Sequence, residues 1–361
     1  MKPLCFHCSA PEKDQVSSDT STAIATKSAQ KLPGRLISGI ISCFQDSNEV
    51  QEDKSETDPY LQPVVRGMLN LGNTCYFNST IQALRNNPIL SKFLAERAHL
   101  FPASGVFRAL NALFQQFDRK KVVDASAFIK IFSKSWKPIR GKGQQDPHEF
   151  LTLLLGSLVE ESERCSDDDR EALKQDFERI FLGSSTVRVE CENCSHVNTH
   201  DENFSSLTLP LCPEKIDQAL NLDYLLQTFT DNNTVDSYAC EKCRQRGISL
   251  SIRPLQLPDV LFINFKRFSA FHNRKGSTSI EKNHQFVGFD SYLQFPSFPD
   301  EYELQAVIVH IGFNYEHGHC ISYFKKGEFW FYSSDTTVNK VPFTEVQNSR
   351  AYVLVYNKLG F

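Results

Sequence analysis

Two pairs of cysteines in the second half of the chain limit its possible folds more than any other feature. Cys191 and Cys194 lie in "CENC", Cys240 and Cys243 lie in "CEKC", and strand-like sequence separates the two pairs. Each pair, at a tight turn, presents two thiolates to one ion, and two such turns make a tetrahedral site. Protein sulfur would fill all four positions. We therefore predict a structural Zn²⁺ that clamps the fold, with no open position for catalysis.

Composition narrows the class of protein. The 361 residues include 11 Cys and carry a formal net charge of -4. An odd number of cysteines, four of them in paired spacing, favours metal-bound and catalytic thiols in a reducing compartment over a disulfide framework. The near balance of charge argues against a nucleic-acid partner. No apolar run approaches the ~20 residues of a membrane helix. We expect an intracellular protein, cytoplasmic, nuclear or both, without an integral membrane segment.

The texture of the sequence divides the chain into two parts. Residues 1–60 are rich in Ser, Thr and charged residues and poor in large apolar ones, which predicts a disordered polar tail. Cys5 and Cys8 in that tail cannot complete a four-ligand site alone, so we interpret them as incidental. Residues 64–361 read as one folded domain, because 40% of the whole chain is hydrophobic and can supply a sizeable core.

The spacing of apolar residues in the folded domain changes from a helical to a strand-like pattern after residue 182. Residues 75–182 read mostly as helices, including one over "TCYFNSTIQALRN" with an apolar face of Phe77, Ile81 and Leu84. Another, over "DPHEFLTLLLGSLVEE", starts at the N-cap Asp146. A third ends at Gly183. Beyond that point the runs "STVRVE", "FSSLTLPL", "LFINFKRF", "LQAVIVHI", "HCISYF", "EFWFYS" and "YVLVYN" read as strands. The order predicts an α+β fold with its cleft between the halves.

A cysteine lies at the junction between a turn and the first predicted helix. In "LNLGNTCYFNSTIQAL" the turn "GNT" runs directly into a helix that begins near Cys75. Free N–H groups and the dipole at a helix N-terminus stabilise an anion, so the thiolate of Cys75 should be favoured. A histidine partner would raise the thiolate fraction further and protonate a leaving amine. Cys75 is therefore a candidate nucleophile, although a buried cysteine can also be inert packing.

The candidate base is one of ten histidines. "HGHCISYF" stands apart, because Gly318 permits a close backbone approach and His319 begins an alternating strand. His317 lies two residues earlier, and the pattern alone does not choose between the two histidines.

Five elements in order now carry a resemblance to a known family. They are "GMLNLGNTCYFNSTIQAL", "GQQDPHEFL", the two Cys-x-x-Cys pairs, "LFINFKRF" and "GHCISY" followed by "WFYSSDTTV". From Gly67 to Asn357 the chain resembles the catalytic domain of the ubiquitin-specific proteases, papain-like cysteine isopeptidases. The resemblance implies a helical thumb, a palm of antiparallel strands and zinc-tipped fingers, here at about 184–255, that grip ubiquitin.

The resemblance also implies roles for single residues. Cys75 matches the nucleophile and His319 the general base. Asn70 matches the oxyanion-stabilising asparagine, whereas Asn73 fits a role in the turn. Asp146 matches a residue that helps to bind the ubiquitin tail, a role compatible with capping a helix. Gly318 at the mouth of the cleft fits the narrow passage that a Gly-Gly tail needs, or serves only a turn.

The sequence departs from the family at two positions. Cys320 follows the histidine where a tyrosine is usual. Ser334 stands where an aspartate or asparagine usually orients the imidazole, and Asp335 is the next acidic position. A serine hydroxyl can accept the Nδ1–H bond of the histidine, but it carries no charge to stabilise the imidazolium. We predict that Ser334 orients His319, with Asp335 or neither residue as the alternatives.

The predicted function is hydrolysis of the isopeptide bond between the C-terminal glycine of ubiquitin and a lysine. Two alternatives remain: a ubiquitin-binding adaptor with a decayed triad, suggested by Ser334 and Cys320, and a protease for a ubiquitin-like modifier. The expected partners are ubiquitin and ubiquitinated proteins, and we expect a monomer.

Overall fold

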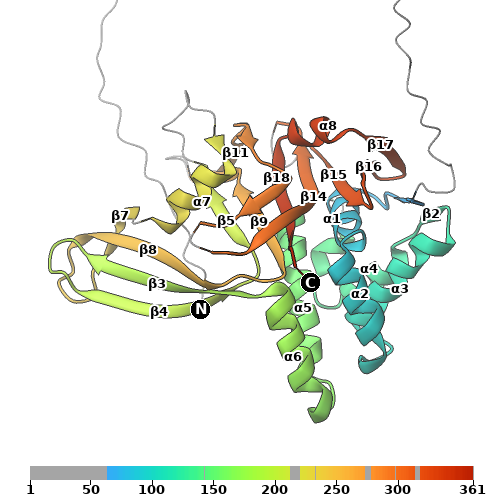
Figure 1. The fold of residues 1–361 in the computed structure, drawn as a ribbon, viewed down its shortest axis with the longest axis horizontal. Helices are drawn as coiled ribbons and strands as arrows, with labels where there is room; N and C mark the ends of the chain where they lie inside the picture. The colour runs from blue at the N-terminus through green and yellow to red at the C-terminus, as the bar shows by residue number, and fades with distance from the viewer. Residues whose placement is uncertain are drawn as a thin grey trace, which may run out of the picture. The chain divides into compact units, whose positions relative to one another are not determined.

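The computed structural model describes residues 63–360, apart from 142, 212–219, 232, 273–277, 297 and 314–317. The expected tail with Cys5 and Cys8 lies outside the described residues, as does the alternative base His317. Within the described part, a group of helices packs against a large sheet, and a second sheet extends to one side (Figure 1).

The helical region contains one helix that is buried on all sides. The region comprises α1 (Cys75–Arg85), α2 (Pro88–Arg97), α3 (Val106–Arg119), α4 (Ser126–Phe132), α5 (Pro147–Ser162) and α6 (Asp167–Phe181), with 3-10 turns at Ala98–Leu100 and Lys137–Arg140. The predicted apolar face of α1 is buried, but so is every residue from Cys75 to Leu84. The reason is that α1 lies between α5 and the large sheet. Its hydroxyls bond within the helix, as when Thr80 donates to the carbonyl of Tyr76.

The ends of two other helices test local predictions. Asp146 caps α5 as expected, because its Oδ1 accepts from the backbone N–H groups of His148 and Glu149. Gly183 does not cap α6: Leu182 closes that helix in an extended conformation, and Gly183 opens the next strand. A side chain at Gly183 would overlap the ring of Phe204. The position is therefore glycine for close packing and not for a left-handed turn.

The large sheet has eight strands and two covered faces. In spatial order it contains β17 (Thr337–Val341), β16 (Phe329–Ser334), β15 (His319–Lys326), β14 (Glu301–Ile311), β18 (Ala351–Lys358), β9 (Val260–Lys266) and β5 (Leu207–Pro210), while β13 (Tyr292–Gln294) pairs with β14. All pairs are antiparallel except β5 with β9. Ile308 and Val353 face the helical core, whereas Val307 and Leu354 join a second core on the opposite face.

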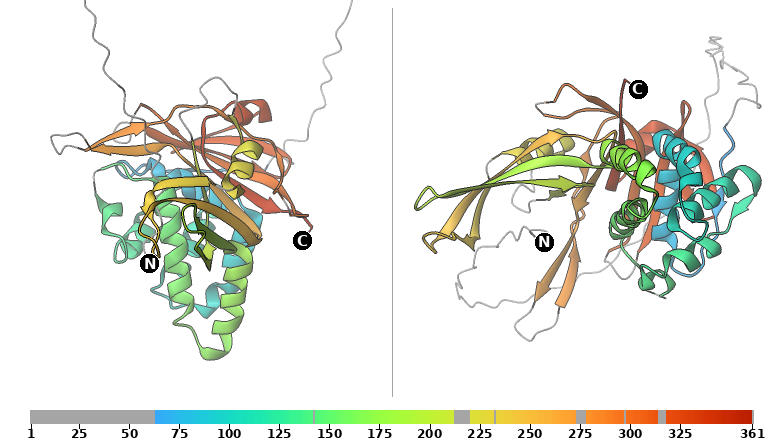
Figure 2. Two further views of the ribbon diagram at one scale, coloured as in Figure 1. Left: turned by 90° about the vertical axis from the view of Figure 1, so that its left-hand side faces the viewer. Right: turned by 90° about the horizontal axis from the view of Figure 1, so that it is seen from below.

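The second sheet carries both cysteine pairs. Its order is β4 (Val197–Phe204), β3 (Gly183–Cys191), β8 (Arg246–Gln256) and β7 (Asn233–Ala239), and it projects away from the helices (Figure 2). β4 is exposed along almost its whole length. A sheet with so little core of its own needs another source of stability, and the cysteine pairs lie where such a source would act.

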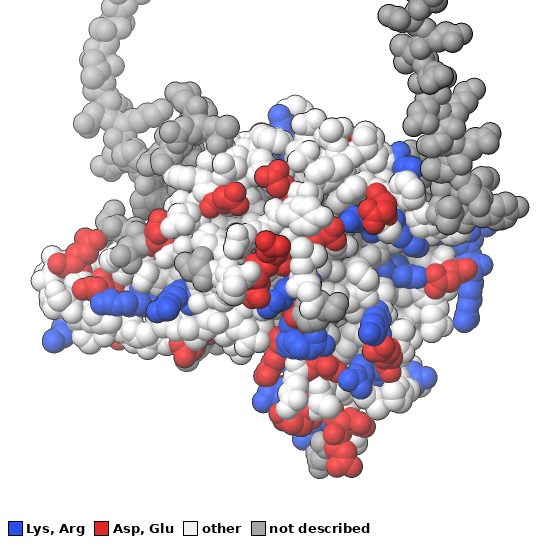
Figure 3. All heavy atoms as spheres, in the orientation of Figure 1, with Lys and Arg blue, Asp and Glu red and all other residues white. Residues whose placement is uncertain are grey.

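The remaining elements are short. They are β1 (Gly67–Met68) with β2 (Val122–Val123), β6 (Leu220–Asn221) with β12 (Val287–Gly288), β10 (Phe268–His272) with β11 (Thr278–Lys282), and the helices α7 (Leu222–Thr230) and α8 (Phe343–Gln347). No helix in the described ranges is long and apolar enough to cross a membrane. Acidic and basic side chains are interspersed on the face drawn in Figure 3.

Candidate active site and metal centre

The turn before α1 is built around the side chain of Asn70. Its Oδ1 accepts from the backbone N–H groups of Gly72, at 3.0 Å, and Thr74, at 3.3 Å. Gly72 and Asn73 both have positive φ, 98° and 55°, so the turn needs residues that tolerate the left-handed region. The predicted role of Asn73 in the turn fits this geometry. The chain then enters α1 with Cys75 as its first residue.

The structure brings Cys75 and His319 together, although they are far apart in the sequence. His319 is the first residue of β15, the strand that packs on α1. Hydrogen bonds from Cys320 and from His319 lower the pKa of Cys75 to about 4, against the opposing effect of burial. The same contact with Cys75 raises the pKa of His319, again against burial. The pair is therefore poised as thiolate and imidazolium.

Ser334 lies against the other side of the imidazole. Its Oγ is 2.8 Å from Nε2 of His319. The predicted contact with Nδ1 is wrong. Ser334 ends β16 diagonally across from His319 on β15, and from there it reaches Nε2, while the ring contacts Cys75 as well.

Asp335 faces a different set of groups. It follows Ser334 in the turn between β16 and β17, with φ of 49°. One carboxylate oxygen accepts from Nδ2 of Asn70 at 2.9 Å, and the other from Nδ2 of Asn78 at 2.7 Å. Its backbone carbonyl accepts from Met68 N–H. Asp335 therefore acts on His319 only through its charge, which raises the pKa of the imidazole.

Sequence reasoning assigned no role to Asn78 or Gln144. Asn78 is 2% exposed and lies one helical turn after Cys75, so a polar residue in that buried position was the available signal. Gln144 belongs to the quoted stretch "GQQDPHEFL", and its side-chain amide donates to the carbonyl of Gly318. It thus ties the segment before α5 to the residue before His319.

The two expected substrate-binding positions lie close to this contact. The second carboxylate oxygen of Asp146 accepts from the hydroxyl of Tyr352. Gly318 has no space for a side chain, because a Cβ atom would overlap the ring of His310 and lie 2.7 Å from the carbonyl oxygen of Ile311. The glycine is therefore required for close approach.

Cys320 occupies the position where the sequence departs from the expected tyrosine. It is 4% exposed and contacts the sulfur of Cys75. That contact and burial raise the pKa of Cys320 far above its usual range. Cys320 consequently stays a neutral thiol and can donate its S–H to the Cys75 thiolate.

The four paired cysteines converge at the end of the four-stranded sheet. Their Sγ atoms lie within 4.8 Å of one another; that of Cys191 is 3.6 Å from Cys243, and that of Cys194 is 3.8 Å from Cys240. A tetrahedral ion with metal–sulfur bonds of about 2.3 Å places its ligands about 3.8 Å apart. The donor set therefore fits a metal ion.

The two cysteine turns have the same backbone design. In each, the first cysteine accepts at its carbonyl from the N–H four residues later and donates to the carbonyl five residues later. The fourth residue after it, Ser195 or Arg244, has positive φ, 53° or 60°. This repetition is typical of paired turns that hold one ion between them.

Comparison with known proteins adds to this geometry. The family profile described as "Ubiquitin carboxyl-terminal hydrolase" matches residues 66–356. The chain belongs to the ubiquitin carboxyl-terminal hydrolase family. Ubiquitin carboxyl-terminal hydrolase 12 of Salmo salar is 28% identical over 310 residues, covering 76% of this chain and 81% of the relative.

Solved structures of this family share the fold. A chain in the structure of the SAGA Ubp8/Sgf11/Sus1/Sgf73 DUB module bound to ubiquitin aldehyde matches with a TM-score of 0.66 and 23% identity, covering 82% of this chain and 70% of that one. The same module bound to monoubiquitin gives a TM-score of 0.64 at 23% identity. The papain-like arrangement of thumb, palm and fingers is therefore confirmed.

Family membership confirms the predicted function. The protein is a cysteine-type deubiquitinase, which hydrolyses the bond between the C-terminal glycine of ubiquitin and a lysine, and ubiquitin is its partner. Neither alternative, the inactive adaptor or the protease for a ubiquitin-like modifier, is favoured by any of these relatives.

Proposed function

We propose that Cys75, His319 and Ser334 form the catalytic triad of this deubiquitinase. One observation carries the proposal: the ring of His319 contacts the sulfur of Cys75 on one side and the hydroxyl of Ser334 on the other. Ser334 holds the ring in the orientation that faces the sulfur, although it adds no charge. The hydrogen bond from Cys320 compensates on the thiolate side of the pair.

The reaction proceeds through a thioester. The Cys75 thiolate attacks the carbonyl carbon of the terminal glycine of ubiquitin, and a tetrahedral oxyanion forms. When this intermediate collapses, the C–N bond breaks and protonated His319 gives its proton to the leaving lysine amine. Neutral His319 then takes a proton from water, which attacks the thioester. Collapse of the second intermediate releases the carboxylate of ubiquitin and restores the Cys75 thiolate.

Asn70 is the proposed donor to the oxyanion. An asparagine amide carries two N–H groups, and only one is needed for the bond to Asp335. The other can donate to the intermediate, and the loss of one such donor typically costs about 10²–10³ in rate. Asp335 sets the direction of this amide, so we assign it a positioning role that reaches both Asn70 and Asn78.

Asp146 and Gly318 are the proposed contacts of the ubiquitin tail. Asp146 stands at the start of α5, two residues after Gln144, whose side chain holds the carbonyl of Gly318. Gly318 keeps the passage beside His319 free of a side chain.

The metal ion is proposed to be one structural Zn²⁺ held by Cys191, Cys194, Cys240 and Cys243, which supplies no catalytic chemistry. We further propose that residues 64–361 form the catalytic domain, with fingers at about 184–255 and a separate polar tail at 1–60. A monomer stays a prediction, and the Ubp8 structures are of a module with several proteins.

A ubiquitin with an electrophilic C-terminus tests the triad. We expect the wild-type protein to form a covalent adduct and Cys75→Ala to form none. Cys165→Ala is the matched control, because Cys165 is also a buried free thiol but lies in the turn between α5 and α6. If the wild type reacts with a probe made from a ubiquitin-like modifier and does not react with the ubiquitin probe, the proposed substrate is contradicted. An adduct that persists in Cys75→Ala would contradict the nucleophile.

A further inference from the structure

A cavity beside β14 has a strongly cationic lining. It has a volume of about 220 Å³, and its described lining includes Arg267, Lys282, His310 and Arg350. No acidic residue is among the described residues that line it. Cations gathered without a carboxylate repel one another, and burial makes the repulsion stronger.

Arg267 is the deepest cation of this cavity. It is 2% exposed, and its Nε and Nη1 donate to the backbone carbonyls of Ala351, Asn283 and Gln285. Its Nη2 is buried and has no hydrogen-bond partner among the described residues. An unsatisfied buried donor of a charged group destabilises the folded state more than a neutral one does. Nη2 of this cavity-lining arginine thus lacks an acceptor in the described part of the chain.

Lys282 and His310 form the wall towards the catalytic centre. Nζ of Lys282 donates to Nδ1 of His310, at 2.9 Å, and to the carbonyls of His310 and Gly312. Burial, then Arg267 and Arg350, lower the pKa of Lys282 to about 8, so it remains mostly charged near neutral pH. Burial and Lys282 lower the pKa of His310 to about 4, so that imidazole is neutral.

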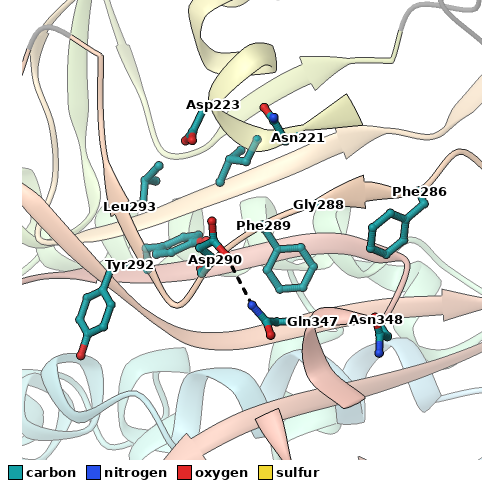
Figure 4. Close-up of a pocket in the computed structure, with 12 residues that line it drawn as sticks. Asn221, Asp223, Phe286, Gly288, Phe289, Asp290, Tyr292, Leu293, Gln347 and Asn348 are labelled. Atoms are coloured by element: carbon teal, nitrogen blue, oxygen red, sulfur yellow. Dashed lines mark hydrogen bonds between the residues drawn. The ribbon is translucent and has the colours of Figure 1, made fainter. Parts of the chain in front are cut away.

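A second cavity shows that a cationic lining is not a general property of this fold. About 360 Å³ of space lies between α7, β12 and α8, where Asp223 and Asp290 join Phe286 and Tyr292 in the lining (Figure 4). Gln347 donates to Asp290 at 3.4 Å. The described lining of that cavity contains no Lys or Arg, so the two cavities differ in sign.

We propose that the cavity lined by Arg267, Lys282 and Arg350 is a binding site for a tetrahedral oxyanion of the phosphate class. The buried Nη2 of Arg267 would donate to one oxygen, and the exposed guanidinium of Arg350 can donate to others from the mouth. A doubly charged anion compensates several cations at once, and guanidinium groups match its geometry.

The site borders the catalytic centre without belonging to it. The ring of His310 packs directly on Gly318, the neighbour of His319. A bound anion would therefore stabilise the backbone around Gly318 from the side of His310. It would not enter the space between Cys75 and His319. Its binding can be measured on the whole chain without ubiquitin, so the result does not depend on the proposed triad.

Titration calorimetry with inorganic phosphate tests the site, with chloride at equal ionic strength as the reference. We expect saturable binding and a rise in Tm that follows phosphate occupancy. Arg350→Gln should weaken phosphate binding about tenfold, as expected for the loss of one charge-assisted hydrogen bond. Arg350→Lys should retain most of the affinity. Arg253→Gln, which removes another exposed arginine, from β8, should change the affinity less than twofold.

Two results would overturn the proposal. One is the absence of saturable phosphate binding in the wild type. The other is an equal loss in Arg350→Gln and Arg253→Gln, which would show general charge screening. A parallel titration with a phosphoserine peptide identifies the source of the oxyanion. Tighter binding of the peptide than of phosphate would assign the site to a phosphorylated protein, and equal or weaker binding to the free ion.

Discussion

Nδ2 of Asn78 lies 2.7 Å from a carboxylate oxygen of Asp335, so the helix that begins with Cys75 is fastened to the turn that follows Ser334. The other oxygen of the same carboxylate holds Asn70, on the other side of Cys75. One acidic side chain therefore aligns two asparagines about the proposed nucleophile. Ser334 contacts the imidazole directly, while Asp335 acts on the groups around it.

The different contacts of Ser334 and Asp335 predict different effects on kcat when each residue is replaced. We expect Ser334→Ala to lower kcat about tenfold, because the ring loses one orienting bond. Asp335→Ala should lower kcat on the order of 10²-fold, since the oxyanion donor Asn70 loses its anchor. Steady-state hydrolysis of a ubiquitin–fluorophore conjugate measures both. Asp335→Asn, which keeps one acceptor, should fall between wild type and Asp335→Ala. A larger loss in Ser334→Ala than in Asp335→Ala would contradict the positioning role of Asp335, while leaving Ser334 in the triad.

The pKa shifts of Cys75 and His319 predict a bell-shaped pH profile. The pKa of Cys75 is lowered to about 4, so the thiolate is present above that pH and is lost as pH falls through it. The pKa of His319 is raised, so the imidazolium is present at lower pH and is lost as pH rises through a value above the usual ~6.5. We expect kcat/KM to follow the thiolate–imidazolium form, with a plateau between these limits. A profile whose acid limb falls near the usual ~8.5 of a free thiol would contradict the ion pair.

Cys320 predicts a specific change in the reactivity of Cys75. Its hydrogen bond is the largest cause of the lowered pKa of Cys75. Hydrogen bonds to charged groups contribute about 1.5–3 kcal/mol, and about 1.4 kcal/mol corresponds to one pH unit. In Cys320→Ala the midpoint for alkylation of Cys75 by iodoacetamide should therefore rise by about one unit or more.

The matched variant is Cys320→Ser, which keeps a donor at the same position and should return the midpoint most of the way. If Cys320→Ala and wild type show the same alkylation midpoint, the thiol of Cys320 has no part in stabilising the thiolate.

The metal centre predicts a dependence of stability on the four cysteines. Elemental analysis should find one zinc ion per chain, and Cys240→Ser should lose it. The projecting sheet has little core, so the domain should then lose at least ~3 kcal/mol of stability, which for a domain of this size lowers Tm by roughly 5 °C or more. Cys165→Ser is the control and should retain its zinc. An unchanged melting curve after chelation would exclude a structural role for the ion.

Features of the fold and the site that depend on a single segment of the chain can be predicted from the sequence. The strand-rich runs follow the helical half in order, the cysteine pairs share a fixed spacing, and Cys75 follows a turn whose residues tolerate positive φ. The bond between Asn70 and Asp335 spans 265 residues, and no local pattern encodes it. No local pattern encodes the contact between Ser334 and Nε2 of His319 either, because the ring nitrogen that faces the hydroxyl depends on how β15 and β16 lie against α1.

Burial also separates what could be predicted from what could not. Periodicity gives α1 one apolar face, but its full burial results from packing between α5 and the sheet. Gly183 reads as a helix terminator because glycine is common there, yet the ring of Phe204 decides its identity. The cationic cavity joins Arg267, which lies between β9 and β10, to Arg350, which lies just before β18, so it exists only in the folded protein.

Gly318 offers the sharpest test of how the base is positioned. A Cβ atom there would overlap the ring of His310 and approach the carbonyl of Ile311 to 2.7 Å, so Gly318→Ala must displace the backbone next to His319. A shift of about 1 Å at a catalytic group can cost about 10² in rate. We therefore expect kcat to fall roughly 100-fold while the protein remains folded by circular dichroism. Gly156→Ala in α5 is the control, because nothing lies within 4 Å of its added Cβ and alanine is favoured in a helix. It should leave kcat unchanged and raise Tm slightly, and full activity in Gly318→Ala would show that the close approach to His310 does not position His319.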